Sequence, residues 1–207
     1  YNDKYGIAMK VVRNVPYLNG STQHKVLSKS IVYQGGMNPG RGLELAVEMM
    51  AFLEGYKLKI IGDGEGLESL KVLAQKKGVS NRINFLGRLA FEDLKVHTEQ
   101  ANIGVLFEEA RGLSFEYSLP NKLFDYIHAQ TPVLASPLVE VKHIIERYGI
   151  GDLLKDRTPE HVAKQIEEMF EKINTYDFAS AKNDLNWHKE EEVLKVVFSP
   201  FLDKAKS

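Results

Sequence analysis

Short apolar runs alternate with longer amphipathic stretches along most of this chain. Runs typical of buried strands occupy residues 31–34, 57–61, 83–86, 102–107 and 133–135. Between them, apolar residues recur at helical spacing in residues 43–53, 67–77, 91–100, 121–128 and 139–148. A last short run at 150–154 predicts an edge strand. Strands that alternate with helices predict an α/β fold, a doubly wound parallel sheet with helices on both faces.

The chain after this alternation is different, because it contains helices without intervening strands. Thr158 and Pro159 are typical of a helix start, and apolar residues continue the pattern at helical spacing beyond them. A final amphipathic helix is predicted at about 187–198. These C-terminal helices are therefore expected to be appended to the sheet domain.

The loops that follow the predicted strands are the places to look for a ligand. They lie at residues 35–42, 62–66, 87–90, 108–120 and 136–138. In an open parallel sheet, ligands bind outside the carboxyl ends of the strands. These loops are therefore expected to converge on one edge of the sheet.

Composition excludes several classes of function. The 207 residues are 43% hydrophobic and 27% charged, with 27 basic and 28 acidic side chains and a net charge of -1. Such a balance gives no reason to expect nucleic acid as a partner. The absence of cysteine excludes disulfides, zinc thiolate sites and thiol catalysis, and it fits a cytoplasmic location. No apolar run approaches the ~18 residues of a membrane span, and no signal peptide is visible.

The stretch 118–136, SLPNKLFDYIHAQTPVLAS, carries the most specific pattern. It predicts a loop, a helix that begins near Pro120, and a buried strand. Asn121, Asp125 and His128 share one face of that helix, and Lys122 lies in its first turn. A helix N-terminus with a nearby cation binds anions. The alternative is that Lys122 and Asp125 form an ordinary surface pair.

Two glycine-rich turns follow predicted strands. Gly35 and Gly36 would let a ligand approach the backbone, and Arg41 would suit a phosphate; a plain turn with a surface arginine is the alternative. Gly62 opens the sequence GDGEG, whose spacing differs from the dinucleotide fingerprint. A tight turn beside a ligand is therefore favoured there over a nicotinamide site.

Three glutamates lie in the longest loop. Glu108, Glu109 and Glu116 could supply acid–base chemistry, although Glu108 is expected to be a solvated loop residue. The six histidines show no metal-ligand spacing, and no serine lies in a nucleophile turn. His128 is expected at the surface, and no metal site is predicted.

Together, these blocks resemble the C-terminal, donor-binding domain of GT-B-fold glycosyltransferases. The resemblance is to retaining family 4, in particular to bacterial surface-polysaccharide transferases, and extends from about residue 31 to 198. The order of blocks is that of the family: GGMNPGRG, IIGDGEGLESL, NRINFLGRL, ANIGVLF and SLPNKLFDYIHAQTPVLAS. The last block is the most specific.

The resemblance implies a role for each matching residue. Asp125 would hold the ribose hydroxyls of a nucleotide, and Arg41 would contact the diphosphate. Asn121 and Lys122 lie at the helix start whose backbone N–H groups bind phosphate. Arg88, with the adjoining backbone at Leu86 and Gly87, lies where the base is cradled. Gly35, Gly36 and Gly62 complete the expected nucleotide-binding set.

The chain also departs from the family pattern. Tyr117 occupies the position of the first of two glutamates, which leaves Glu109 and Glu116 as candidates for the contact to the donor sugar. Met37 stands where a second basic residue is usual, and Pro120 cannot donate an N–H. The expected catalytic residues are therefore Arg41 and Lys122, with Glu109 and Glu116.

The resemblance implies a hexosyltransferase-like enzyme that moves a sugar from a UDP- or GDP-sugar, with retention, to a glycan or lipid-linked acceptor. No further cofactor is expected. Because the chain starts at Tyr1, we expect a fragment that lacks an N-terminal acceptor domain and is inactive alone. Residues 1–30 would be the interdomain linker, 31–180 the donor-binding Rossmann-like domain, and 181–207 the crossover helix.

Location and alternative functions complete these expectations. The full-length protein would be cytoplasmic, with peripheral association at the inner face of the membrane. A nucleotide-sugar epimerase of related fold is the closest alternative function. A nicotinamide-dependent dehydrogenase and a non-catalytic nucleotide-binding module are alternatives of other classes.

Overall fold

A six-stranded parallel sheet forms the centre of the protein. The computed structural model describes residues 2–6, 9–18 and 26–204. The strand order is β3-β2-β1-β4-β5-β6, and every neighbouring pair is parallel. The strands are β1 Ser30–Gln34, β2 Lys57–Ile61, β3 Ile83–Gly87, β4 Ile103–Leu106, β5 Val133–Ala135 and β6 Gly151–Leu153. The predicted doubly wound α/β fold is confirmed.

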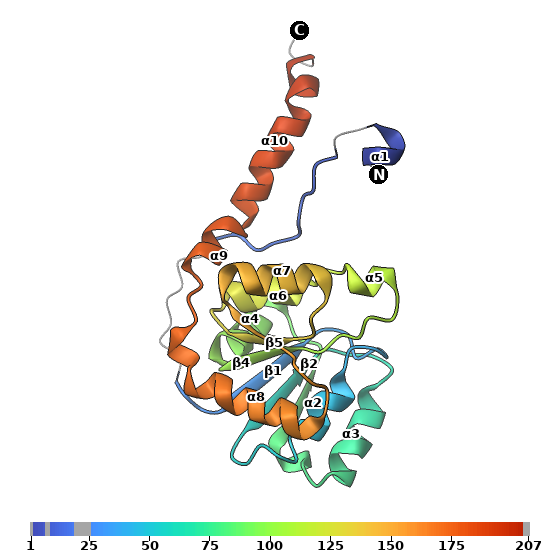
Figure 1. Ribbon diagram of the computed structural model, residues 1–207, viewed down its shortest axis with the longest axis vertical. Helices are drawn as coiled ribbons and strands as arrows, with labels where there is room; N and C mark the ends of the chain where they lie inside the picture. The colour runs from blue at the N-terminus through green and yellow to red at the C-terminus, as the bar shows by residue number, and fades with distance from the viewer. Residues whose placement is uncertain (1, 7–8, 19–25, 205–207) are drawn as a thin grey trace.

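Helices cover both faces of this sheet (Figure 1). The helices of the described residues are α1 Asn2–Tyr5, α2 Leu43–Met49, α3 Leu67–Lys76, α4 Phe91–Gln100, α5 Leu113–Glu116, α6 Asn121–His128, α7 Val139–Tyr148, α8 Pro159–Glu171, α9 Ala179–Asp184 and α10 Trp187–Lys204, with 3-10 turns η1 Ser80–Arg82 and η2 Ile173–Thr175. Of these, α1 and α10 lie away from the sheet (Figure 1). The helix expected over 43–53 ends at Met49. In residues 50–53, each backbone N–H donates to the carbonyl three residues earlier, which is the pattern of turns rather than of an α-helix.

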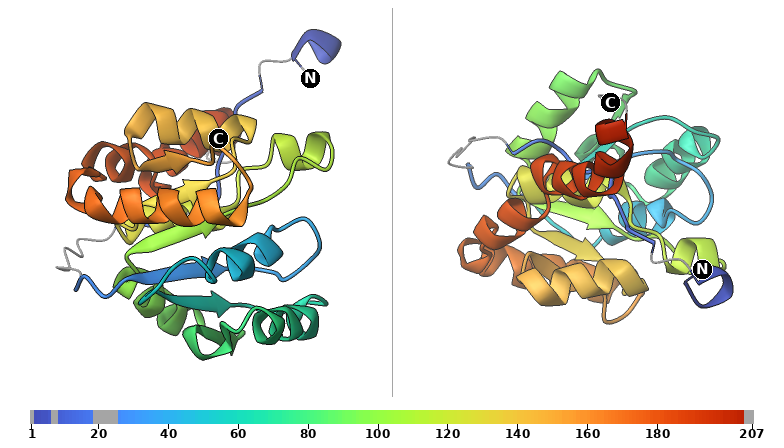
Figure 2. Two further views of the ribbon diagram at one scale, coloured as in Figure 1. Left: turned by 60° about the horizontal axis from the view of Figure 1, so that its bottom comes forward. Right: turned by 90° about the horizontal axis from the view of Figure 1, so that it is seen from above.

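Two apolar clusters, one on each face, hold the layers together. Ile31 and Tyr33 of β1 pack with α2, α3 and α8, whereas Val32 packs with α6 and α7 on the other face. Successive side chains of a strand point to opposite faces. Since both faces are covered, the central strands β1, β4 and β5 are buried along their whole length. In β2, nearer the edge, Lys57 and Lys59 alternate with buried apolar residues. Figure 2 shows the two helical layers from other directions.

The sheet changes direction between β1 and β4. The chain runs outward from β1 through β2 to β3, and then returns to place β4 beside β1. At such a switch point, the loops after the two central strands part and leave a crevice. The loops after β1 and β4 therefore open at the carboxyl edge of the sheet.

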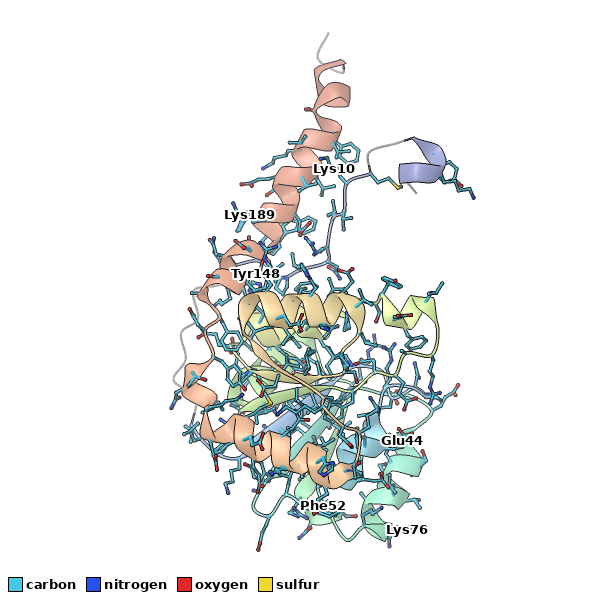
Figure 3. All side chains as sticks on the ribbon, viewed as in Figure 1. Lys10, Glu44, Phe52, Lys76, Tyr148 and Lys189 are labelled. Atoms are coloured by element: carbon cyan, nitrogen blue, oxygen red, sulfur yellow. The ribbon has the colours of Figure 1, made fainter. Side chains whose placement is uncertain are left out.

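The C-terminal helix α10 extends away from the sheet beside the segment 9–18 (Figure 1). Arg13 binds the buried carboxylate of Glu190 through its backbone N–H at 3.0 Å and its guanidinium at 3.2 Å. Figure 3 shows Tyr148 near the base of this helix, where its hydroxyl donates to Asp184 of α9 at 3.1 Å. Within the described residues, none of the helices is both long and apolar enough to cross a membrane.

Candidate functional site

A cleft of ≈ 540 Å³ opens at the switch point, between the loop after β1 and the start of α6. Six of the residues expected to bind nucleotide line it: Gly35, Gly36, Arg41, Asn121, Lys122 and Asp125. They come from two segments far apart in sequence, which meet because parallel strands present their carboxyl ends at one edge. The structure therefore brings together most of the predicted set.

The loop between β1 and α2 places Arg41 at the cleft. Gly42 caps α2 in the left-handed region, with φ +69°, and a Cβ there would lie 2.2 Å from the carbonyl oxygen of Phe107. The backbone N–H of Glu109 donates to the carbonyl of Gly40 at 2.9 Å, which ties this loop to the one after β4. Glycine at position 42 thus allows the close approach that fixes Arg41.

A buried ion pair lies at one end of the cleft. Lys122 Nζ is 2.7 Å from Glu108 Oε1, and Arg41 Nη1 is 3.6 Å from the same oxygen. The side chain of Glu108 is 0% exposed, so the expectation of a solvated loop residue is wrong. Glu108 lies inside because two cations from other segments surround it. Burial lowers the pKa of the Lys122 ammonium, and the Glu108 carboxylate opposes that effect.

Lys122 is also held by aromatic and backbone neighbours. Its Nζ lies 4.1 Å from the centre of the Tyr33 ring, a cation–π contact. A Cβ at Gly35 would lie 3.3 Å from the same Nζ, so the glycine leaves room for the ammonium at the cleft wall. The Tyr33 hydroxyl donates to the Gly36 carbonyl at 2.7 Å. With one carboxylate and two cations, the group of Glu108, Lys122 and Arg41 carries one net positive charge.

The N-terminus of α6 faces the same end of the cleft. Pro120 is its N-cap, and its carbonyl accepts the N–H of Leu123 at 3.0 Å. Among the described residues, no acceptor takes the N–H groups of Asn121 and Lys122. Such N–H groups and the helix dipole favour an anion. This end of the cleft is built to receive negative charge.

Asp125, three residues after Lys122 on α6, also lines the cleft and has an uncharged partner. Its Oδ2 accepts a 2.6 Å hydrogen bond from Gln34 Nε2, and Gln34 Oε1 accepts one of 2.6 Å from the Thr98 hydroxyl. Burial raises the pKa of Asp125 to about 6, and the Gln34 hydrogen bond acts to lower it. Sequence reasoning missed Gln34 and Thr98. The one available signal was a polar residue ending the apolar strand β1.

Four predicted residues lie outside the lining of this cleft. Gly62 packs against the backbone of the cleft residue Gly35. A Cβ at position 62 would lie 1.9 Å from the Gly35 carbonyl oxygen, so only glycine fits there. Arg88 is exposed after β3. Glu109 pairs with two arginines of the surface, Arg111 at 2.8 Å and Arg157 at 3.7 Å.

The remaining candidates are Glu116 and the histidine of α6. Glu116 ends α5 half-buried, and no ion pair to it is found within the described ranges. His128 is buried rather than at the surface, with Nε2 2.8 Å from the Leu185 carbonyl. In the part of the chain that the structure covers, no group of three or more potential metal ligands gathers.

The fold and the cleft together define a Rossmann-like α/β domain with an anion-favouring switch point. The family model for glycosyl transferases group 1 matches residues 20–182. The chain therefore belongs to the glycosyl transferases group 1 family, and its fold is that of the GT-B glycosyltransferases it resembles.

Curated relatives are longer than this chain. An uncharacterised glycosyltransferase of Methanocaldococcus jannaschii is 28% identical over 147 residues, 68% of this chain and 36% of the relative. A GDP-mannose-dependent alpha-(1-6)-phosphatidylinositol monomannoside mannosyltransferase of Mycobacterium tuberculosis is 25% identical over 118 residues, 56% of this chain and 31% of the relative. The chain thus spans about a third of the length of these relatives.

Solved structures share the fold at low sequence identity. TarM of S. aureus, in a complex that contains UDP, has a TM-score of 0.71 and 16% identity, and the match covers 93% of this chain and 39% of TarM. HepE of Anabaena, also in complex with UDP, has a TM-score of 0.69 and 16% identity, with 83% of this chain and 49% of HepE covered. These two matches support the fold and nothing finer.

Proposed function

We propose that this chain is the nucleotide-sugar-binding domain of a retaining glycosyltransferase. The supporting observation is what the cleft brings together: two cations and unpaired N–H groups at the start of α6, and the carboxylate of Asp125 about one helical turn further along. A nucleoside diphosphate has the matching groups, with negative phosphates beside a ribose that carries hydroxyl groups. Membership of the group 1 family supports the same assignment.

In the anion-binding part of the cleft, Arg41 and Lys122 bind the diphosphate together with the N–H groups that begin α6. During transfer, the bond between the anomeric carbon and the diphosphate oxygen breaks. A bond to an acceptor hydroxyl oxygen forms on the same face of the sugar, and the hydroxyl proton is released. Charge then develops on the leaving diphosphate, where fixed cations and N–H groups stabilise it.

Further along α6, Asp125 accepts hydrogen bonds from the ribose hydroxyls. The base lies toward Arg88 and the backbone after β3, and the donor sugar lies toward Glu109 or Glu116. UDP and GDP are the nucleotides to test first, because two similar structures contain UDP and one relative is GDP-mannose-dependent.

The acceptor side belongs to the rest of a longer protein, as in the relatives, of which the match to this chain covers only about a third. Residues 1–30 then form the interdomain linker, 31–180 the donor domain and 181–207 the crossover helix. A glycan or lipid-linked acceptor would be bound by that other domain, with peripheral docking at the inner face of a membrane. By itself, this chain is expected to bind nucleotide and to transfer little or no sugar.

Calorimetric titration with UDP, GDP, ADP and NAD tests the proposal. We expect saturable binding of one nucleoside diphosphate that weakens about 10- to 100-fold in Asp125→Ala, because hydrogen bonds to a charged acceptor are lost. Glu68→Ala is the matched control, since it removes an exposed carboxylate on α3. Equal binding by Asp125→Ala and the wild type, or preference for NAD, would contradict the proposal.

A further inference from the structure

A chain of hydrogen bonds connects Asp125 to the interior of the domain. Gln34 ends β1, Thr98 lies in α4 and Asp125 lies in α6. The Thr98 hydroxyl donates to Gln34 Oε1 at 2.6 Å, and Gln34 Nε2 donates to Asp125 Oδ2 at 2.6 Å. Three separate elements therefore meet through one side-chain amide.

Burial shields two members of this relay from water. Gln34 is 3% exposed and Thr98 is 2% exposed, so water does not compete for their polar atoms. Asp125, in contrast, is only partly buried and lines the cleft. Within the described residues, no hydrogen bond reaches its second oxygen, Oδ1. The relay thus holds one carboxylate oxygen and leaves the other for a ligand.

The charged groups around Asp125 largely balance one another. They are Lys95, Glu99 and His128 at a small cavity of ≈ 40 Å³ beside it, and Arg41 and Lys122 along the cleft. Lys95 pairs with Glu99 at 3.8 Å, and Lys122 pairs with Glu108 at 2.7 Å. Burial lowers the pKa of His128, which keeps that ring neutral near pH 7. The closest polar contact to Asp125 is therefore the amide of Gln34.

We propose that Gln34 and Thr98 are positioning residues that orient the carboxylate of Asp125 toward the cleft as the acceptor for ribose hydroxyl groups. The identity of the ligand rests on the proposed function, whereas the relay itself does not. Thr98 fixes which end of the amide faces Asp125, because its hydroxyl donates to Oε1 and leaves Nε2 for the carboxylate.

The Thr98 hydroxyl has a second acceptor, and this gives the relay a second state. Its Oγ1 also lies 2.8 Å from the carbonyl of Leu94, but it carries a single hydrogen. When Asp125 is protonated, the amide can turn over: Asp125 donates to Oε1, Nε2 donates to Thr98, and Thr98 donates to Leu94. Every group stays satisfied, so binding of ribose is linked to ionisation of Asp125.

An NMR titration of the Asp125 carboxyl carbon tests the relay directly. In wild type the midpoint should lie near the pKa of about 6. In Gln34→Leu it should rise by roughly one pH unit, and in the nearly isosteric Thr98→Val by about half as much, because a donor to the ionised form is lost or disoriented. Gln165→Leu is the control, since Gln165 is also buried but bonds Lys155 and Leu153 instead.

Calorimetry with UDP and GDP gives the functional readout. Near pH 6, Gln34→Leu should bind the preferred nucleotide roughly fivefold more weakly than wild type, because less of its Asp125 is ionised, and binding should recover as the pH is raised. Structural damage alone would not recover with pH. Gln165→Leu should show neither effect.

The two proposals fail in different ways. If Gln34→Leu and Thr98→Val leave the carboxyl midpoint at the value of the Gln165→Leu control, the relay is wrong whatever the protein binds. If the midpoint moves as expected but no nucleoside diphosphate binds to wild type, the relay stands and the proposed ligand is wrong.

Discussion

Two carboxylates, Glu108 behind the cleft wall and Asp125 in the cleft lining, have different kinds of partner. Glu108 is completely buried and contacts two cations, Lys122 at 2.7 Å and Arg41 at 3.6 Å. Asp125 is partly buried and contacts an amide, that of Gln34 at 2.6 Å. The first carboxylate is neutralised by the protein, whereas the second keeps its charge available for a ligand.

This difference shows how one cleft can hold both ends of a nucleotide. Glu108 orders the cations but leaves them one excess positive charge for phosphate. Asp125 retains an acceptor for a ligand, and burial raises the pKa of its carboxyl to about 6. A buried ion pair and a lone carboxylate therefore predict different responses to mutation and to pH.

The largest expected effect is at the buried ion pair. Lys122→Met leaves Glu108 charged and without its closest partner, which should lower the free energy of unfolding by about 3–5 kcal/mol. Urea denaturation at neutral pH measures it. The double variant Lys122→Met with Glu108→Gln should regain most of that loss while still failing to bind nucleoside diphosphate.

An exposed ion pair of the same length supplies the control. Lys71 lies 2.7 Å from Glu68 on the surface of α3, and Lys71→Met should change stability by less than about 1 kcal/mol. If Lys71→Met and Lys122→Met destabilised the protein equally, desolvation would not be what distinguishes Glu108.

The next largest effect on stability is expected where Gly62 packs against Gly35 beneath the cleft. Gly35 lies beside Lys122 and directly follows Gln34, and Gly62 packs against its carbonyl. Gly62→Ala should lower the free energy of unfolding by about 3 kcal/mol, from the 1.9 Å clash and from φ +139°. Gly78→Ala is the control, because Gly78 has φ +70° but open space around it. A loss of nucleotide binding by Gly62→Ala without loss of stability would instead indicate a direct ligand contact.

The fold was predictable because its signals are local and repeated. Each strand is a short apolar run closed by glycine or polar residues, and each helix shows its own spacing. The convergence of the loops on one edge of the sheet followed from a general rule of parallel sheets rather than from any one residue. Helix ends were less predictable: the apolar pattern of α2 continues to Leu53, but the last residues close as turns.

The site was predictable only where its signal is local, as in a loop that directly follows a strand. Arg41 was predicted in that way, whereas Lys122 and Asp125 were predicted from the pattern of the helix that begins near Pro120 and from the family resemblance. The burial of Glu108 was not predictable, since its cations come from the loop before α2 and from α6. Gln34 was missed for the same reason, because its partners are α4 and α6 residues distant in sequence.

Removing the charge of Asp125 is expected to stabilise the protein, whereas the substitutions above destabilise it. The folded pKa of Asp125 is about 6 against an unfolded value of 3.8, so its ionised form opposes folding above pH 6. The asparagine side chain is uncharged and has the same shape as aspartate. Asp125→Asn should therefore stabilise the protein by roughly 2 kcal/mol at pH 8, allowing for the partial exposure of Asp125. The gain should vanish as the pH falls to about 4, while nucleotide binding stays weak throughout.

Asp156→Asn is the control for that pH dependence. Asp156 is fully exposed, and its pKa is lowered by hydrogen bonds from Thr158. Any stability it contributes is present at neutral pH and lost on acidification, which is the reverse of Asp125. Thermal unfolding of both variants at acidic and alkaline pH would show whether the two respond in opposite directions; a common direction would contradict the assignment for Asp125.

The smallest effects are expected at two partly buried carboxylates, Glu109 and Glu116. Glu109→Gln and Glu116→Gln should each change the free energy of unfolding by less than about 1 kcal/mol and leave nucleoside diphosphate binding intact. Glu109 is already engaged by Arg111 and Arg157, whereas Glu116 has no ion pair within the described ranges. Glu116→Gln should therefore be the variant that loses the extra affinity of a sugar nucleotide over its nucleoside diphosphate. Calorimetry with matched ligand pairs decides between them. A loss confined to Glu109→Gln would mean that a carboxylate paired with arginine can still serve a ligand, and the contrast between neutralised and available carboxylates would then apply only to buried groups.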